Sequence, residues 1–472
     1  MVFVLIDALR RDVVTQSIMP FLSSFSRRCL DFRNAYSVVN ATDPSLTSMF
    51  TGYYPSTHGL IHHGERVEPS DLSTLQYIDF LTEILKRNGY KTIALDFLGR
   101  WHKRGFDRYI NPGDTFLKRF LKNVFKLVSH MPISIRNFIT RMYVSVFLGS
   151  ERKKYFGLPY TAGTAFSKAE SIISKLYKDN NRFFLFIHLW DTHIPYNASE
   201  ALGDDRELEK TVEKLVDGEE KNKITLGDLK QVIPGPWIDR LINQYDSSTL
   251  ISSIIKDYLI ASRYVDSQLN HFIDFMEEKE LLEKTIIIIT SDHGESLGEH
   301  NIWFDHHGLY EPTIQTPLII YTPEYRGKII DALVQHIDLM PLLLEFLGIK
   351  YEPPVPWDGL NIIDILEYGK HNLRTILYAE EAHTERKYMI RMGKYKYITA
   401  LKPEDAICRY CNIVHGGVEE LYDLEKDPRE EENLIELYPD IAAELRSKLM
   451  SVIKELSRKR MRLKIKKLKR RK

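Results

Sequence analysis

The chain has 472 residues, of which 43% are hydrophobic and 28% are charged, and its formal net charge at pH 7 is zero. This composition supports a large buried core and excludes an intrinsically disordered chain. The length predicts one large domain with a smaller one beside it. No apolar run reaches the roughly eighteen residues of a transmembrane helix, so we expect none.

The first residues and the cysteine content indicate the cellular compartment in which we expect the protein. The apolar run Val2–Ile6 has the length of a strand and lacks the basic segment and cleavage site of a secretory signal. The three cysteines, Cys29, Cys408 and Cys411, predict no disulfide framework and suit a reducing compartment. We therefore expect a cytoplasmic protein, with peripheral binding at the inner membrane face as an additional expectation.

Short β-branched runs alternate with amphipathic segments along the first three quarters of the chain. The runs are typical of buried strands and occupy Val2–Ile6, Thr92–Leu95, Phe183–His188, Thr285–Thr290 and Leu318–Tyr321. Apolar residues three to four positions apart predict helices at Leu72–Arg87, Ala165–Tyr177, Tyr258–Glu277 and Gln335–Leu347. This alternation predicts an α/β fold with a mostly parallel sheet covered by helices on both faces, over residues 1–372.

Two segments interrupt the alternation. Residues 116–147 mix apolar side chains with six cations and no acid, and Pro132 divides them. They predict basic amphipathic helices that either pack as a cap on the body or lie on a membrane surface. Residues 204–232 carry many charges and predict an exposed insertion.

The last hundred residues have a different pattern. Short strands at Tyr388–Arg391 and Lys394–Ile398, followed by a helix near Pro439 to Leu456, predict a smaller α+β subdomain over residues 373–456. Residues 457–472 form a basic tail. Eleven of the last fifteen residues are Lys or Arg and none is acidic, so the rest of this neutral chain carries −11. The tail predicts either a solvated end or binding to an anionic membrane, without a specific nucleic-acid partner; oligomeric state stays open.

Polar residues occur where predicted strands end. Asp7 follows the first strand, and Asp292-His293-Gly294 follows the strand Thr285–Thr290. Ligands of α/β sheets bind beyond the carboxyl ends of the strands. Adjacent Asp and His residues can both bind a metal there, although an isolated Asp at this place is also a common helix cap.

A polar turn precedes a short predicted helix at Asn40-Ala-Thr42-Asp-Pro-Ser45. A hydroxyl at a helix N-terminus is well placed to attack a bound oxyanion, because the exposed N–H groups favour negative charge. An ordinary capping turn is the alternative. Further polar candidates near strand ends are His188, Asp191, His193, His306 and His307.

The pair Cys408-x-x-Cys411 has the spacing of zinc ligands, and His415 follows closely. A fourth ligand is not evident nearby in the sequence. The alternatives are a zinc site and a surface loop with two free thiols.

Several motifs together resemble the sulfatase family of the alkaline phosphatase superfamily. VLIDALRRD resembles its opening strand, and Thr42–Gly52 followed by YPSTHG resembles its nucleophile turn. The segments that resemble the later family motifs are HLWDTHIPY, TSDHGESLGEH, DHHGLYEPTIQTPLII and ELYDLEKDPREEENL. The resemblance covers nearly the whole chain and implies an alkaline-phosphatase-like mixed, mostly parallel sheet.

The resemblance also implies roles for individual residues. The implied ligands of a divalent metal are Asp7, Thr42, Asp292 and His293, with Zn²⁺ or Mn²⁺ favoured and Mg²⁺ or Ca²⁺ as alternatives. The implied catalytic residues are Thr42, His193 and His307, and the implied contacts to an anionic ester substrate are Asp191, His306 and Ser45. A second metal bound by Asp191, His193 and His307 is left open.

Three positions depart from the family pattern. Ala8 follows Asp7 where sulfatases have a second aspartate, and His293 replaces a frequent asparagine. Thr42 and Leu46 replace the formylglycine precursor and its arginine. Threonine could give only a ketone, so a direct hydroxyl nucleophile is the simpler interpretation. We therefore expect a metal-dependent hydrolase or transferase that acts on phosphate esters through a phosphothreonine; sulfate-ester hydrolysis and non-catalytic binding are the alternatives.

Overall fold

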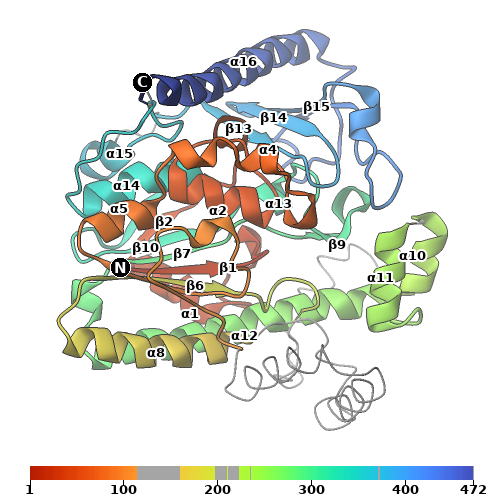
Figure 1. Ribbon diagram of the computed structural model, residues 1–472. Helices are drawn as coiled ribbons and strands as arrows, with labels where there is room; N and C mark the ends of the chain where they lie inside the picture. Colours follow the sequence, from red (N-terminus) through yellow and green to blue (C-terminus); the bar gives the residue numbers. More distant parts are fainter. Residues whose placement is uncertain (114–159, 197–209, 211–222, 234, 370–372, 471–472) are drawn as a thin grey trace, which may run out of the picture.

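The computed structural model describes residues 1–113, 160–196, 210, 223–233, 235–369 and 373–470. Its centre is an eight-stranded sheet in the order β11-β2-β10-β7-β1-β6-β4-β5 (Figure 1). These strands are β1 (Val2–Ile6), β2 (Leu30–Phe32), β4 (Lys91–Leu95), β5 (Arg108–Ile110), β6 (Phe183–Leu189), β7 (Ile287–Thr290), β10 (Leu318–Tyr321) and β11 (Lys328–Ile330). Every neighbouring pair is parallel except the two that β10 forms with β7 and β2. The predicted mixed, mostly parallel sheet is therefore confirmed.

Both faces of the sheet are buried. In β1, Val2, Val4 and Ile6 enter one core, whereas Phe3 and Leu5 enter the other. The first core is shared with α1 (Pro20–Phe25), α8 (Ala162–Lys178) and α12 (Ile251–Glu278). The opposite core is shared with α2 (Thr42–Thr51), α5 (Leu81–Arg87) and α14 (Leu339–Phe346). Burial on both faces explains why these strands are continuous apolar runs rather than alternating ones.

The helix predicted at Leu72–Arg87 is wrong in its first half. The chain there forms α4 (Pro69–Leu72) and a 3₁₀ turn at Leu75–Tyr77, and only α5 continues to Arg87. The Glu83 carboxylate accepts a 2.9 Å hydrogen bond from the Phe80 N–H. This contact satisfies a backbone donor that the first turn of α5 would otherwise leave unpaired, so a new helix starts here.

The remaining short elements connect these layers. They are α3 (Pro55–His58), α10 (Leu226–Val232), α11 (Pro236–Tyr245), α13 (Glu311–Ile314), α15 (Ile363–Tyr368), β3 (Ala35–Tyr36), β8 (Ser296–Leu297), β9 (Trp303–Asp305) and β12 (Val334–Gln335). The insertion expected at 116–147 lies outside the described residues. Of the insertion expected at 204–232, the structure describes residue 210 and the residues from 223 onward. The helix α10 begins three residues after residue 223.

The predicted α+β subdomain is confirmed. It contains an antiparallel sheet of β13 (Ile376–Glu380), β14 (Lys387–Met392), β15 (Tyr395–Ala400) and β16 (Glu419–Asp423), in that order. The long helix α16 (Pro439–Arg470) crosses this sheet (Figure 1). Leu445, Leu449 and Leu456 of α16 share a buried cluster with Ile390 and Leu421 of the sheet.

The prediction that the last helix ends near Leu456 is wrong. The helix α16 continues to Arg470, because the basic residues that follow are good helix formers and no Gly or Pro interrupts them. Leu463 is buried with Tyr53, and Lys459 forms an ion pair with Asp358. The first part of the tail therefore packs on the large domain. Within the part of the chain that the structure describes, no helix is long and apolar enough to cross a membrane.

Candidate active site

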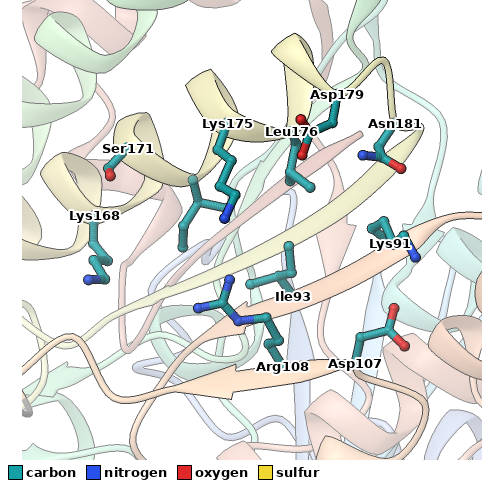
Figure 2. A pocket seen from close by; sticks show the side chains of 11 residues that line it. Lys91, Ile93, Asp107, Arg108, Lys168, Ser171, Lys175, Leu176, Asp179 and Asn181 are labelled. Carbon is teal, nitrogen blue, oxygen red and sulfur yellow. The ribbon is translucent and has the colours of Figure 1, made fainter.

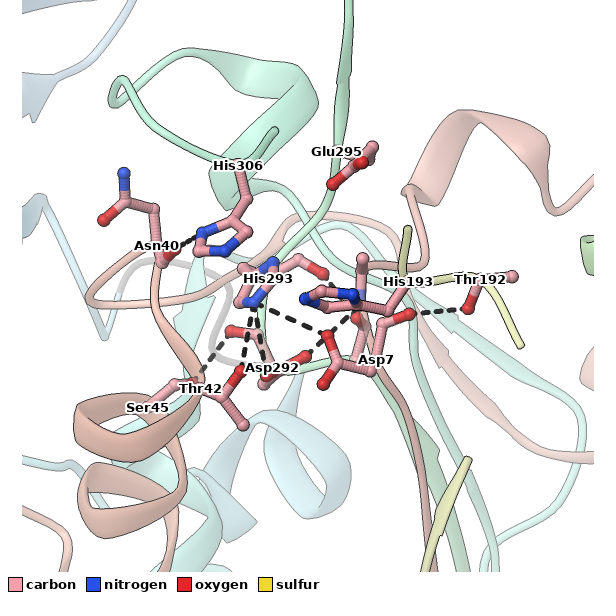
Figure 3. Close-up of polar contacts among 12 residues, drawn as sticks. Asp7, Asn40, Thr42, Ser45, Thr192, His193, Asp292, His293, Glu295 and His306 are labelled. Atoms are coloured by element: carbon pink, nitrogen blue, oxygen red, sulfur yellow. Dashed lines mark hydrogen bonds and ion pairs between the residues drawn. The ribbon is translucent and has the colours of Figure 1, made fainter. Parts of the chain in front are cut away.

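Three candidate metal ligands meet at the carboxyl ends of β1 and β7. Asp7 directly follows β1, and Asp292 and His293 lie just beyond β7. The parallel pairing of β1 with β7 brings the three side chains together, and one ligand atom from each lies within 4.8 Å of the others. All three are buried (Figure 3).

Thr42 is the first residue of α2 and points into this group (Figure 3). Its Oγ1 lies 3.4 Å from Nε2 of His293, and only 1% of the residue is exposed. The same Nε2 lies 3.4 Å from Oδ2 of Asp292 and 3.6 Å from Oδ1 of Asp7. The structure therefore brings together all four residues that the sequence suggests as metal ligands.

The chemistry of this group fits a divalent cation. Oδ1 of Asp7 and Oδ2 of Asp292 are buried without a hydrogen-bond donor. A buried carboxylate oxygen without a partner is costly, and a cation would supply one. The Nδ1 of His293 donates to the Gly294 carbonyl at 2.8 Å, so Nε2 presents its lone pair to the carboxylates. Two carboxylates and one imidazole are a ligand set that can hold a divalent cation.

The electrostatics of the group agree with this fit. Burial, together with the neighbouring Asp7 carboxylate, raises the pKa of Asp292 to about 7. Burial also disfavours the charge on Asp7, but the histidines around it, His193 first, lower its pKa below the usual value. Burial lowers the pKa of His293 to about 4, so its ring is neutral at pH 7. A neutral imidazole beside two acids is the form that binds a metal.

The resemblance implies that Ser45 contacts the substrate. In the structure its hydroxyl contacts the backbone of the loop that carries the metal-ligand candidates. Its Oγ donates a 2.8 Å hydrogen bond to the Asp292 carbonyl, and Ser37 donates to the same carbonyl at 2.7 Å. Ser45 lies one turn after Thr42 on α2. This hydrogen bond therefore holds α2 against the loop that carries Asp292 and His293.

His306 and His193 lie next to the metal-ligand candidates (Figure 3). The ring of His306 stacks on His293 with 4.1 Å between centroids, and its Nδ1 donates to the Asn40 carbonyl. The ring of His193 lies 6.2 Å from that of His306, and its Nδ1 donates to the Ile194 carbonyl at 2.7 Å. Both imidazoles are thus oriented by backbone carbonyls beside Thr42 and the metal ligands.

Two other implied site residues have different surroundings. Asp191 accepts a hydrogen bond from the Ala162 N–H at 3.2 Å and so caps α8. His307, which the resemblance made catalytic, lies instead beside Cys408 and His415. Consecutive side chains next to a strand point to opposite sides, which separates His307 from His306. Within the described ranges, Asp191, His193 and His307 do not form the second metal group that the sequence left open.

A buried chain of polar contacts behind Asp7 joins His188, a candidate from the sequence, to Asp96, which was not among the candidates. The Asp7 Oδ2 lies 3.2 Å from Nε2 of His188, whose Nδ1 lies 3.2 Å from Oδ1 of Asp96. His102 and Tyr109 contact the other oxygen of Asp96. Although burial opposes it, the carboxylates of Asp96 and Asp7 raise the pKa of His188 to about 10. Asp96 follows β4 directly, so the strand-end argument that selected Asp7 could have found it.

We expect Asp96→Asn to weaken the affinity for the catalytic metal by about 10- to 100-fold, the usual cost of losing an outer contact to a metal ligand. The neutral amide would no longer hold the charged His188 ring against Asp7. Equilibrium metal titration of the stripped protein measures the change, with the fold checked by circular dichroism. Asp274→Asn, on the exposed surface of α12, is the control. Equal affinities in the two variants would contradict a positioning role for Asp96.

A separate pocket of about 350 Å³ lies between α8 and the start of β4 (Figure 2). Its charged lining includes Lys91, Asp107, Arg108, Lys168, Lys175 and Asp179. Lys91 is the first residue of β4, whereas the candidate site lies where the strands end. The pocket is therefore not part of that site.

The fold and the strand-end cluster define an alkaline-phosphatase-like hydrolase. The family model described as Sulfatase matches residues 1–349, and the model described as N-sulphoglucosamine sulphohydrolase, C-terminal, matches residues 298–458. The chain belongs to the sulfatase family.

Individual relatives are distant. A sulfatase of Formosa agariphila is 24% identical over 84% of this chain and 74% of that protein. An N-acetylglucosamine-6-O-sulfatase of Bacteroides thetaiotaomicron is 25% identical over 88% and 78%. The match to a choline-sulfatase of Rhizobium meliloti is 31% identical but spans only 38% of this chain and 32% of that protein.

Solved structures share the fold across the chain. The phosphonate monoester hydrolase of Agrobacterium radiobacter superposes with a TM-score of 0.66 at 17% identity, covering 96% of this chain and 95% of that one. A 2-O GAG sulfatase superposes with a TM-score of 0.62 at 17% identity, covering 97% and 92%. At this identity the likeness concerns the fold alone.

Proposed function

We propose that this member of the sulfatase family hydrolyses a monoanionic ester, with the unmodified hydroxyl of Thr42 as nucleophile. The observation that carries the proposal is the position of Thr42 Oγ1, buried at the start of α2 and 3.4 Å from the metal-ligand candidate His293. A hydroxyl placed beside metal ligands and a helix N-terminus is arranged for nucleophilic attack on an oxyanion.

A divalent cation bound by Asp7, Asp292 and His293 would lower the pKa of the Thr42 hydroxyl and neutralise charge in the transition state. The Thr42 hydroxyl would lose its proton to solvent as Oγ1 forms a bond to sulfur or phosphorus and the bond to the ester oxygen breaks. His193, beside this group, would donate a proton to the departing oxygen. His193 would then take a proton from the water that attacks the same centre, while Oγ1 of Thr42 leaves that centre and regains a proton from solvent. The N–H groups at the start of α2 would bind the anionic oxygens in both steps.

The local sequence supports a hydroxyl in place of formylglycine. The aldehyde forms from an unbranched side chain, whereas Thr42 carries a methyl group on its Cβ. Leu46 occupies the position of the family arginine and is fully buried in the apolar core with Phe50. No guanidinium is therefore available from that position to support an aldehyde hydrate.

Charge supports a monoanionic substrate. One divalent cation and the two carboxylates of Asp7 and Asp292 sum to about zero, burial keeps the ring of His306 neutral by lowering its pKa, and the proton donor His193 adds at most one positive charge. A site with at most one excess positive charge suits an ester with one negative charge better than a phosphate monoester dianion. Sulfate monoesters, phosphodiesters and phosphonate monoesters all have that single charge.

Within this class, sulfate esters are the first candidate, because relatives that align with most of the chain are named as sulfatases. The comparisons do not support the preference for phosphate esters drawn from the sequence. Phosphodiesters and phosphonate monoesters are the second candidate. Thr42 itself favours them, since a threonine alkoxide has to transfer the group in two substitutions, a route that phosphoryl groups follow readily.

We expect a panel of esters with one shared aryl leaving group to separate these classes. Sulfate monoesters, phosphodiesters and phosphonate monoesters should all have higher kcat/KM values than the phosphate monoester, with the sulfate ester highest. Rates are measured with Mn²⁺, Zn²⁺, Mg²⁺ and Ca²⁺ in turn. Fastest turnover of the phosphate monoester would overturn the charge argument. Faster turnover of a phosphodiester than of the sulfate would reverse the order of the two candidates, and no turnover with any metal would contradict the hydrolase itself.

A further inference from the structure

A second cluster of metal-ligating side chains lies outside the candidate active site. It consists of His307, Cys408, Cys411 and His415, and one ligand atom from each lies within 4.8 Å of all the others. All four residues are buried, with exposed fractions between 0% and 4%. The surface loop with free thiols that the sequence left as an alternative is therefore not what the structure contains.

The backbone between the cysteines forms a tight turn. Residues Ile407 and Val414 pair as an isolated antiparallel bridge, which closes the loop at its base. Inside it, the Cys408 N–H donates to the Ile413 carbonyl and the Asn412 N–H donates to the Cys408 carbonyl, both at 2.8 Å. This turn directs both thiols to one side, and His415 follows directly after the bridge.

His307 reaches the turn from the large domain, about one hundred residues earlier in the chain. Its Nε2 lies 3.3 Å from Nε2 of His415 and 3.8 Å from Sγ of Cys408. In a tetrahedral zinc site, bonds of about 2.0–2.1 Å to nitrogen and about 2.3 Å to sulfur separate two nitrogens by about 3.3 Å and a nitrogen from a sulfur by about 3.6 Å. The observed separations agree with those of zinc ligands.

Outer contacts orient both imidazoles toward the centre of the cluster. The Nδ1 of His415 donates a 3.0 Å hydrogen bond to the His300 carbonyl, which leaves its Nε2 to face the cluster. The Nδ1 of His307 lies 3.4 Å from Oδ2 of Asp305. A carbonyl or carboxylate behind each ring is the usual outer contact of a zinc-bound histidine.

Helix α11 and the residue before it pack against the turn that carries the cysteines. Gly235, just before α11, lets the backbone approach closely, since a Cβ there would lie 2.2 Å from the Tyr410 carbonyl oxygen. Trp237 stacks on Tyr410 with 6.0 Å between ring centroids. With four protein ligands and this cover, the cluster lacks the open position that a catalytic zinc requires.

We propose that His307, Cys408, Cys411 and His415 bind a structural Zn²⁺ ion that fastens the C-terminal subdomain to the large domain. Two sulfur and two nitrogen ligands at these separations select zinc among the common divalent ions. The ion would also fix the residue next to His307 in sequence, His306, which stacks on His293. The proposal is independent of the proposed function, because none of its four ligands belongs to the Thr42 group.

X-ray absorption at the zinc edge tests the proposal on the intact protein, purified in reductant with zinc present. We expect a tightly bound zinc with two sulfur and two nitrogen neighbours, in addition to any zinc that the catalytic site takes up. The Asp292→Asn variant should keep this sulfur-bound zinc, which separates it from any metal at the catalytic site. Zinc without sulfur neighbours, iron in its place, or a Cys408–Cys411 disulfide that persists in reductant would each overturn the proposal.

A pair of matched variants adds a second readout. Cys408→Ser with Cys411→Ser should lose one zinc equivalent and the sulfur signal, and should unfold at a lower temperature. Cys29→Ser is the control, because Cys29 is also a buried free thiol but contacts the Phe25 carbonyl instead. Retention of the sulfur-bound zinc in the double variant would contradict the assignment. If that variant does not fold, the spectrum of the wild-type protein still decides.

Discussion

Thr42→Ala is expected to lower kcat by about four orders of magnitude or more, because removal of a nucleophile abolishes covalent catalysis. Thr42→Ser keeps the hydroxyl at the start of α2 and should retain a measurable part of the activity. The rates are compared at equal metal occupancy, so that loss of the nucleophile is separated from loss of the metal. A wild-type rate in Thr42→Ala would assign the attack to another group.

The mass of the intact protein tests whether Thr42 is modified, which the rates alone do not show. The resting protein should have the mass of its unmodified sequence, without oxidation at Thr42. Rapid acid quench during turnover should trap the sulfated or phosphorylated protein, and fragmentation should place the group on Thr42. An oxidised Thr42 in the active protein would contradict direct attack by its hydroxyl.

Asp292→Asn and His293→Ala are expected to abolish tight binding of the catalytic metal and to reduce activity to background. Each variant removes one of the three protein groups that meet at the ends of β1 and β7. Elemental analysis and kinetics measure the two effects, and His271→Ala, exposed on α12, is the control. Full occupancy of a metal without sulfur neighbours in both variants would refute these ligands.

The same variants separate metal binding from folding. Without metal, the buried carboxylates of Asp7 and Asp292 repel each other, and asparagine at position 292 removes one of the two charges. We therefore expect metal-free Asp292→Asn to have a Tm no lower than that of the metal-free wild type. A large drop in Tm would mean that Asp292 also has a structural role.

The central sheet could be predicted because its strands are buried on both faces. Five runs of β-branched residues correspond to β1, β4, β6, β7 and β10 within two residues at each end. Strands such as β5 and β11 have three residues each and lie at the edges of the sheet, where composition carries too little signal. The end of α16 could not be predicted for a different reason. Its charged residues predict a tail, whereas Leu463 contacts its buried partners only in the folded protein.

In the candidate site, too, some residues could be predicted from the sequence and others could not. Asp7, Thr42, Asp292 and His293 could be selected because each follows a strand or opens a helix, and strand order then brings them together. The position of His307 beside Cys408 and Cys411 could not be predicted from the sequence, because those cysteines lie a hundred residues away. No local pattern indicates which of two consecutive histidines turns toward Thr42 and which turns toward the cysteines.

The position of β1 in the sheet has a consequence for synthesis on the ribosome. Both neighbours of this strand come much later in the chain: β6 begins at Phe183 and β7 at Ile287. Contacts between such distant segments form slowly, and nascent chains emerge at about 5–20 residues per second. The apolar residues of β1 are therefore synthesised many seconds before the strands that pair with them in the sheet. During that interval the apolar side chains of β1 lack the two strands that cover them in the folded protein.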